Sequence, residues 1–203
     1  FKNLTFTVGQ ADSIIIMGPS GSGKTSLIRL LAGLWPLDSG TISKPEKVGK
    51  NGLFFLPQRP YLTLGTLRAQ LVYPSQEEDR QAHNDDALKT LLKLVKLDHL
   101  IASDDGLDTV APWNDVLSGG EKQKIGFIRL FYHKPKFCIM DEATAALDED
   151  SEQICMTECI SRKITFISVG HRSSLLKYHK RRMTLKPSGD KNIGSTYRIE
   201  PLL

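Results

Sequence analysis

The stretch GPSGSGKT, residues 18–25, places three glycines and one lysine between an apolar run and an amphipathic segment. This GxxxxGK[ST] spacing is that of a phosphate-binding loop, because glycines let backbone N–H groups converge on anionic oxygens and the following helix adds its dipole. We expect Lys24 to reach the β- and γ-phosphates of a nucleotide and Thr25 to give its hydroxyl to Mg²⁺. The expected nucleotide-binding residues are Gly18, Pro19, Ser20, Gly21, Ser22, Gly23, Lys24, Thr25 and Ser26.

An acidic pair follows the apolar run FCIM, residues 137–140. A phosphate-binding loop needs a carboxylate to hold its metal, and Asp141 at the end of an apolar strand suits that position. Glu142 beside it is the candidate base for the attacking water. Such a pair is common by chance, but its occurrence downstream of a phosphate-binding loop favours the functional interpretation.

A second serine- and glycine-containing motif, LSGGEKQ at residues 117–123, opens another amphipathic segment. It has neither the lysine of the first loop nor a preceding strand. A serine cap followed by glycines at a helix start is an anion site, because the N–H groups of the first turn and the helix dipole both face the ligand. The sequence therefore predicts two separate phosphate-contacting elements.

With this motif the chain resembles the ATP-binding cassette (ABC) family, whose signature LSGGQ binds the γ-phosphate of a nucleotide held by a partner subunit. Other landmarks follow in family order: Gln58 resembles the Q-loop glutamine, Asp148 the D-loop aspartate and His171 the switch histidine. The resemblance implies that Gln58 joins Thr25 and Asp141 as a metal contact, and that Glu142, His171 and Gln58 serve catalysis. It implies that Ser118, Gly119, Gly120, Glu121 and Asp148 act in trans.

The likeness extends from Phe1 to about His179 and is greatest to subfamily D, the half-transporters of fatty acyl-CoA or cobalamin and their bacterial relatives. QRPYLTLGTLRAQLVYP, DVLSGGEKQ, RLFYHKP and GHRSSLLKYH carry it. Glu121 stands where the wider family has Gln, which is usual in subfamily D. The family's adenine-stacking aromatic is expected upstream of Phe1.

Strands that alternate with helices must position these motifs. We expect an α/β fold, a P-loop NTPase core whose mostly parallel sheet is flanked by helices, with antiparallel β elements and an inserted α-helical subdomain. The core is expected at residues 1–60 and 117–203, and the insertion at 61–116. Expected strands are 4–8, 13–17, 52–58, 136–141 and 163–170, then a strand, turn and strand after Arg181; expected helices are 25–34, the segment from Ser118 to Pro135, and 151–160.

Composition excludes several classes of protein. The 203 residues carry 27 Lys and Arg against 23 Asp and Glu, a net charge of +4, which lacks the concentrated charge of a nucleic-acid binder. The three cysteines, Cys138, Cys155 and Cys159, fit reduced thiols in a cytosol-facing compartment. Trp35 and Trp113 are expected to be packing residues. No apolar run approaches a membrane span, and the N-terminus is not typical of a signal peptide.

Together these patterns predict an ATPase domain that dimerises around ATP and Mg²⁺ and drives a half-transporter through a transmembrane domain. Its partner is a second nucleotide-binding domain, identical or related, and no nucleic acid is expected. The alternative is a soluble ABC ATPase acting on nucleic acid or ribosomes, which the absence of sustained heptads in the short insertion disfavours. We expect the cytosolic face of the peroxisomal membrane, with lysosomal and bacterial inner membranes as the other locations.

Overall fold

The structure is a computed structural model that describes residues 1, 3–45, 52–75, 84–187 and 195–202. The chain divides into two compact units. Unit 1 comprises Phe1–Pro57, Pro135–Glu142 and Ile160–Leu203, and unit 2 comprises Gln58–Lys134 and Ala143–Cys159. The expected insertion, residues 61–116, lies inside unit 2, which also takes in the segments on its C-terminal side.

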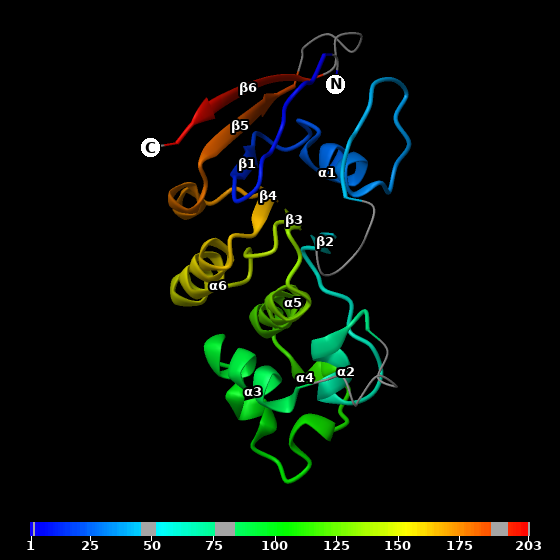
Figure 1. The fold of residues 1–203 in the computed structure, drawn as a ribbon, viewed down its shortest axis with the longest axis vertical. Helices are drawn as coiled ribbons and strands as arrows, with labels where there is room; N and C mark the ends of the chain where they lie inside the picture. Colours follow the sequence, from blue (N-terminus) through cyan, green and yellow to red (C-terminus); the bar gives the residue numbers. More distant parts are fainter. Residues whose placement is uncertain (2, 46–51, 76–83, 188–194, 203) are drawn as a thin grey trace. The chain divides into compact units, whose positions relative to one another are not determined.

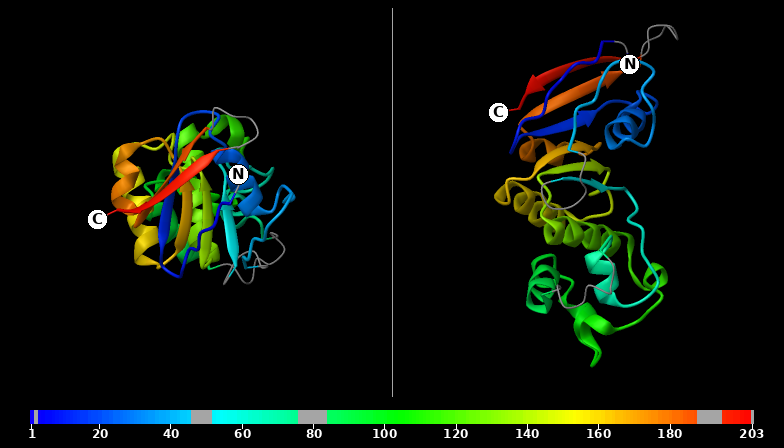
Figure 2. Two further views of the ribbon diagram at one scale, coloured as in Figure 1. Left: turned by 90° about the horizontal axis from the view of Figure 1, so that it is seen from above. Right: turned by 45° about the vertical axis from the view of Figure 1, so that its right-hand side comes forward.

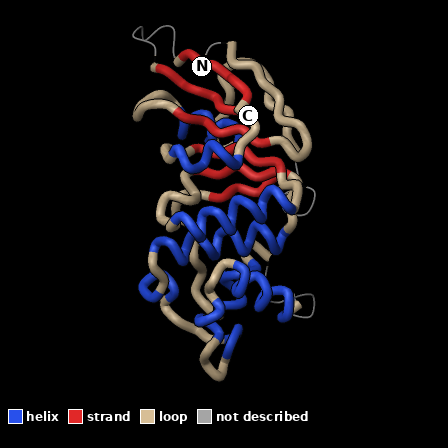
Figure 3. The backbone as a smooth tube through the Cα atoms, turned by 90° about the vertical axis from the view of Figure 1, so that its left-hand side faces the viewer, coloured by secondary structure: helices blue, strands red, loops and turns tan. Residues whose placement is uncertain are grey.

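A six-stranded sheet organises unit 1 (Figures 1 and 3). Its strands are β1 Ser13–Met17, β2 Leu53–Leu56, β3 Phe137–Asp141, β4 Thr165–Val169, β5 Arg181–Lys186 and β6 Thr196–Pro201. They lie in the order β2-β3-β4-β1-β5-β6, with β5 and β6 antiparallel and every other neighbouring pair parallel. This order confirms the predicted fold class. The turn residues 188–194 between the last two strands lie outside the described part.

The core of unit 1 explains why its central strands are almost continuously apolar. Helix α1, Lys24–Ala32, packs against β3 and β4 (Figure 2). Leu27 and Ile28 of the helix join Ile14 and Ile16 of β1 in one buried cluster. A strand covered on both faces has no solvent-facing positions, so it loses the polar alternation of a surface strand.

The expected strand at residues 4–8 is wrong. Its alternation is real as burial, because Leu4, Phe6 and Val8 are half-buried while the threonines between them are exposed. The backbone, however, bonds to side chains: the Arg181 guanidinium donates to the carbonyl of Thr7 at 2.6 Å. A similar side-chain bond joins the N–H of Thr5 to the Tyr197 hydroxyl. Alternating burial therefore arose here without a strand.

Unit 2 is helical in its described residues (Figure 3). Its helices are α2 Leu67–Val72, α3 Asp85–Leu94, the short 3-10 helices Asp98–Ile101 and Gly106–Asp108, α4 Trp113–Val116, α5 Gly119–His133 and most of α6, Glu149–Ser161. Helices α2 and α3 both pack on α5. Residues 76–83, part of a polar stretch assigned to the insertion, are outside the description. Within the described ranges no helix is both long and apolar enough to cross a bilayer.

A buried histidine links the end of β4 to the 3-10 helix Ser173–Tyr178 of unit 1. The His179 ring is 5% exposed, its Nε2 meets the Ser168 hydroxyl, and its Nδ1 lies 2.7 Å from the carbonyl of Leu175. Burial lowers the pKa of His179 to about 4. The neutral ring satisfies both partners if Nδ1 donates to the carbonyl and Nε2 accepts from the hydroxyl.

This histidine predicts sensitivity to acid. Because the folded pKa lies below the ordinary value of about 6.5, only the unfolded chain takes up a proton between these values. The contribution of His179 to the free energy of unfolding should therefore be fully present above about pH 6.5. The free energy of unfolding should then fall by up to about 3 kcal/mol as the pH drops to 4. Urea unfolding across this range tests the native protein against His179→Gln. Equal losses in both proteins would contradict the assignment.

Candidate nucleotide-binding site

The strand order of unit 1 collects the expected chemical groups at one edge of the sheet. Val169, the last residue of β4, is paired in register with Ile16 of β1 on one side and Asp141 of β3 on the other. Since these strands are parallel, their carboxyl ends coincide. The glycine-rich loop, the acidic pair and the segment leading to His171 therefore leave the sheet together.

Two glycines of the loop cannot be replaced without strain. A Cβ on Gly18 would lie 2.3 Å from the carbonyl oxygen of Leu185 in β5. Gly23 precedes α1 with φ of 89°, a left-handed conformation that residues with a side chain rarely adopt. No side chain caps this helix start. The first-turn N–H groups, which have no partners within a helix, are left for an anion.

Side chains inside the loop fit a phosphate ligand. Lys24 is 7% exposed, and its ammonium donates to the carbonyls of Gly18 and Pro19 at 2.8 and 2.9 Å. The hydroxyl of Ser22 is fully buried and has no hydrogen-bond partner among the described residues. A buried hydroxyl without a partner carries a desolvation penalty. Phosphate oxygens would supply the missing acceptor, so the residues present fit the group that the motif implies.

The acidic pair and the histidine lie together. Burial first, and the neighbouring Glu142 second, raise the pKa of Asp141. Nε2 of His171 is 3.4 Å from Oε1 of Glu142, and both side chains remain partly exposed, at 55% and 29%. Glu142 has a left-handed φ of 48°, and its N–H donates to the carbonyl of Val169 at 3.1 Å. The Glu142 carboxylate thus lies next to the His171 ring.

The described residues of this site do not form a metal site made of protein ligands alone. Among the described residues no cluster of three or more His, Cys, Asp or Glu side chains could hold an ion. Mg²⁺ commonly takes one or two carboxylates and completes its shell with water and phosphate oxygens. A single half-buried carboxylate with a raised pKa, beside a phosphate-binding loop, fits a cation that arrives with a nucleotide.

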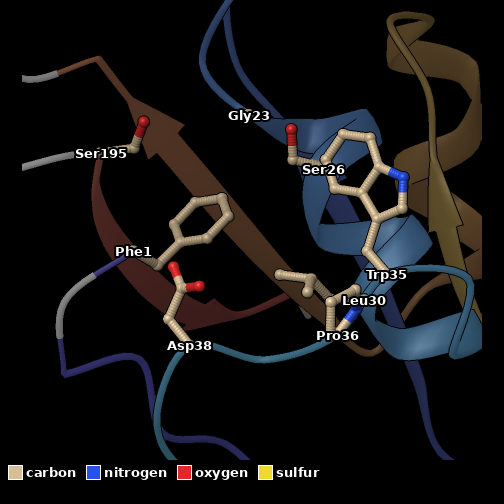
Figure 4. Close-up of a pocket in the computed structure, with 8 residues that line it drawn as sticks. All are labelled: Phe1, Gly23, Ser26, Leu30, Trp35, Pro36, Asp38 and Ser195. Atoms are coloured by element: carbon tan, nitrogen blue, oxygen red, sulfur yellow. The ribbon is translucent and has the colours of Figure 1, made fainter.

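An open pocket of about 460 Å³ adjoins the loop within unit 1. Figure 4 shows the rings of Phe1 and Trp35, the Asp38 carboxylate and the Ser26 hydroxyl around it. Trp35 is 44% exposed and stacks its ring on the Arg29 guanidinium, so it is not the packing residue expected. Trp113 is 4% exposed, which confirms the prediction that it is a packing residue. Aromatic faces beside a carboxylate acceptor can hold a planar, amino-bearing ring.

The signature residues lie in unit 2 at the start of α5. The Ser118 hydroxyl accepts from the N–H of Glu121 at 3.2 Å, and the Glu121 carboxylate accepts from the N–H of Ser118 at 2.9 Å, forming a capping box. Burial alone would raise the pKa of Glu121, but these bonds and one to His99 lower it overall. Ser118 and Gly119 are exposed. A charged, capped and accessible helix terminus results.

The remaining expected residues of unit 2 are also exposed. Gln58 follows directly after Pro57, two residues beyond β2. Asp148 precedes α6, where its carboxylate accepts from the N–H and hydroxyl of Ser151 at 2.8 and 3.0 Å. These bonds lower the pKa of Asp148. Asp148 therefore has a local capping role in addition to any contact with a partner.

The family follows from these elements and from comparison with known proteins. Residues 1–145 match the model of the ABC transporter family. The chain belongs to the ABC transporter family. Its fold matches an ATP-bound bacterial Atm1-family ABC exporter with a TM-score of 0.73 and 25% identity, over 90% of this chain and 33% of that one. The chain is thus an ABC nucleotide-binding domain, of a family that hydrolyses ATP to drive transport.

Two curated relatives bear subfamily D names. The chain is 48% identical over 181 residues to ATP-binding cassette sub-family D member 3 of Mus musculus, covering 88% of this chain and 27% of that protein. It is 43% identical over 182 residues to the lysosomal cobalamin transporter ABCD4 of Homo sapiens, covering 88% and 30%. The chain thus spans less than a third of the length of these relatives.

The raised pKa of Asp141 predicts that Asp141→Asn stabilises the protein without nucleotide but removes its response to Mg²⁺. The pKa of Asp141 in the folded protein is above its ordinary value. Asp141 therefore adds to the free energy of unfolding at pH values below its ordinary pKa, and this contribution is lost as the pH rises through the pKa of the folded protein. Asp141→Asn should therefore raise the melting temperature without nucleotide at pH 7.5. It should also abolish the extra stabilisation that Mg²⁺ adds to ATP. A lower melting temperature without ligand, or an unchanged Mg²⁺ effect, would contradict this account.

Proposed function

We propose that this chain is the ATPase domain of a half-transporter and that two such domains, identical or related, enclose two Mg-ATP molecules head to tail. The observation that carries the proposal is the accessible capping box of α5, which supplements the glycine-rich loop of unit 1. One loop covers only part of a triphosphate, and phosphoryl transfer depends on spreading the remaining charge. A second copy provides the missing donors.

Each domain supplies the binding half of one site. Lys24 leaves its loop carbonyls for the β- and γ-phosphates, and Ser22 hydrogen-bonds a phosphate oxygen. Thr25, Gln58 and Asp141 would hold Mg²⁺, which would neutralise phosphate charge when bound. The other loop residues, Gly18 to Ser26, provide main-chain donors. The Phe1 and Trp35 pocket adjoins Gly23 and Ser26 of this loop.

The chemical step belongs to the carboxylate and histidine at the sheet edge. Glu142 accepts a proton from the water that attacks the γ-phosphate. His171, 3.4 Å from that carboxylate, contacts the γ-phosphate and keeps Glu142 aimed at the water. The partner completes the site with Ser118, Gly119, Gly120, Glu121 and Asp148. The N–H groups of Gly119 and Gly120, and the Ser118 hydroxyl once it turns from the Glu121 carboxylate to which it donates, stabilise charge on the transferred group.

The similar proteins support a function in transport rather than an action on nucleic acid or ribosomes. One relative is named a lysosomal cobalamin transporter, and two further similar proteins are an ABC exporter and a subfamily D member. We infer a lipid-like or cofactor substrate of the fatty acyl-CoA or cobalamin class. The domain then works at the cytosolic face of a peroxisomal membrane, with lysosomal and bacterial inner membranes as alternatives, attached to a transmembrane domain.

Replacing Glu142 separates binding from turnover. Glu142→Gln should lower the ATP hydrolysis rate by about a hundredfold or more while ATP still binds, because only the proton acceptor is lost. Size-exclusion chromatography with ATP and Mg²⁺ should then show a trapped dimer. Asp104→Asn, an equivalent exchange at an exposed position, is the control and should leave both properties unchanged. Full turnover by Glu142→Gln would overturn the role of this carboxylate.

A further inference from the structure

A buried glutamine on α5 joins segments that are far apart in the chain. Gln123, five residues after Ser118, is 3% exposed. Its Nε2 donates to the carbonyl of Gln58 at 3.0 Å, and its Oε1 accepts from the N–H of Ala146 at 2.8 Å. A reversed amide would oppose acceptor to acceptor and donor to donor, so the two partners together fix its orientation. All these residues belong to unit 2.

Steric contacts give independent evidence that the segment ending at Asp148 rests on the start of α5. A Cβ on Gly120 would lie 2.9 Å from the carbonyl oxygen of Ala146, which is closer than real Cβ contacts come. A Cβ on Gly119 would lie 3.6 Å from the Cβ of Ala146. The glycine at position 120 is therefore required by packing within the chain as well as by any anion.

We propose that Gln123 is a positioning residue for ATP hydrolysis, tying the main chains of Gln58 and Ala146 to the helix that begins at Ser118. The inference rests on the proposed function. Through its side-chain amide, Gln123 holds two segments against the start of α5 at Ser118. One contains Gln58, the proposed Mg²⁺ contact, and the other leads to Asp148. Displacement of such groups by about 1 Å can lower a rate about a hundredfold.

A second buried glutamine provides a matched control. Gln70 on α2 is fully buried, and its amide also bridges two backbone groups: it accepts from the N–H of Thr63 at 2.8 Å and donates to the carbonyl of Thr66 at 3.1 Å. Neither partner belongs to the proposed site. Gln70→Met removes these two bonds and a third from the Thr63 hydroxyl at 3.2 Å, whereas Gln123→Met removes two. A loss of activity confined to Gln123→Met therefore reflects positioning and not stability.

The experiment uses the full-length protein and measures ATPase rate, KM for ATP, Mg²⁺ dependence and melting temperature. Gln123→Met should lower kcat by about tenfold or more with KM within about twofold, because the glycine-rich loop is unaltered. Gln123→Glu keeps the acceptor for Ala146 and loses the donor to Gln58. It should raise the Mg²⁺ concentration needed for half-maximal rate. Gln70→Met should lower the melting temperature similarly and leave kcat within about twofold.

Two outcomes would overturn the positioning role. One is that Gln123→Met and Gln70→Met change kcat equally for equal losses in melting temperature. The other is a normal Mg²⁺ dependence in Gln123→Glu, which also decides the question if the methionine variant fails to fold. The native protein and Glu142→Gln, run alongside, isolate the proposed function: if hydrolysis does not depend on Glu142, that function fails whatever the Gln123 variants show.

Discussion

The structure depends on the alignment of three parallel strands at their carboxyl ends. Val169 of β4 is in register with β1 and β3, so the loop that follows β1 and the carboxylates that end β3 leave the sheet at the same level. Apolar burial on both faces, with α1 sharing the buried cluster that contains Ile14 and Ile16, keeps β1 in the centre of the sheet between β4 and β5. Phosphate-binding and catalytic groups thus derive their positions from the packing of the core.

The second constraint is that a triphosphate needs more donors than one loop presents. Unit 1 supplies Lys24 and the uncapped start of α1, and unit 2 supplies a separate helix start with its own capping box. The two helix starts differ in a way that suits different tasks. That of α1 has no side-chain cap, whereas Ser118 and Glu121 satisfy each other and leave an exposed surface for a neighbour. This division of donors is the basis for a site shared by two subunits.

Local sequence patterns predicted most helices and strands, but contacts between residues far apart in the chain decided whether residues 4–8 form a strand. The apolar runs at 13–17 and 163–170 contain strands, and the serine at position 118 correctly predicted a helix start. Residues 4–8 had the alternation of a strand without a strand, because side chains of Arg181 and Tyr197 bind their backbone. No neighbouring sequence could reveal those partners.

The same limit applies to the candidate site. Motif spacing named Lys24, Glu142 and His171, and the geometry of unit 1 brings the last two within 3.4 Å. It could not reveal that Ser22 is buried without a partner, or that Trp35 is exposed beside the loop. Gln123 was also missed, since its partners lie 65 and 23 residues away in the chain. Such roles follow from tertiary contacts that a motif does not encode.

Mixing two inactive variants tests the shared site most directly. Lys24→Ala disables the loop of a subunit and Ser118→Arg disables its signature cap, so a mixed head-to-tail dimer has one site with both defects and one intact. Equal mixing should restore hydrolysis to about a quarter of the native rate, because about half the dimers are mixed and each has one working site. Activity no greater than the mean of the two variants would contradict the account, since a site confined to one subunit cannot be complemented.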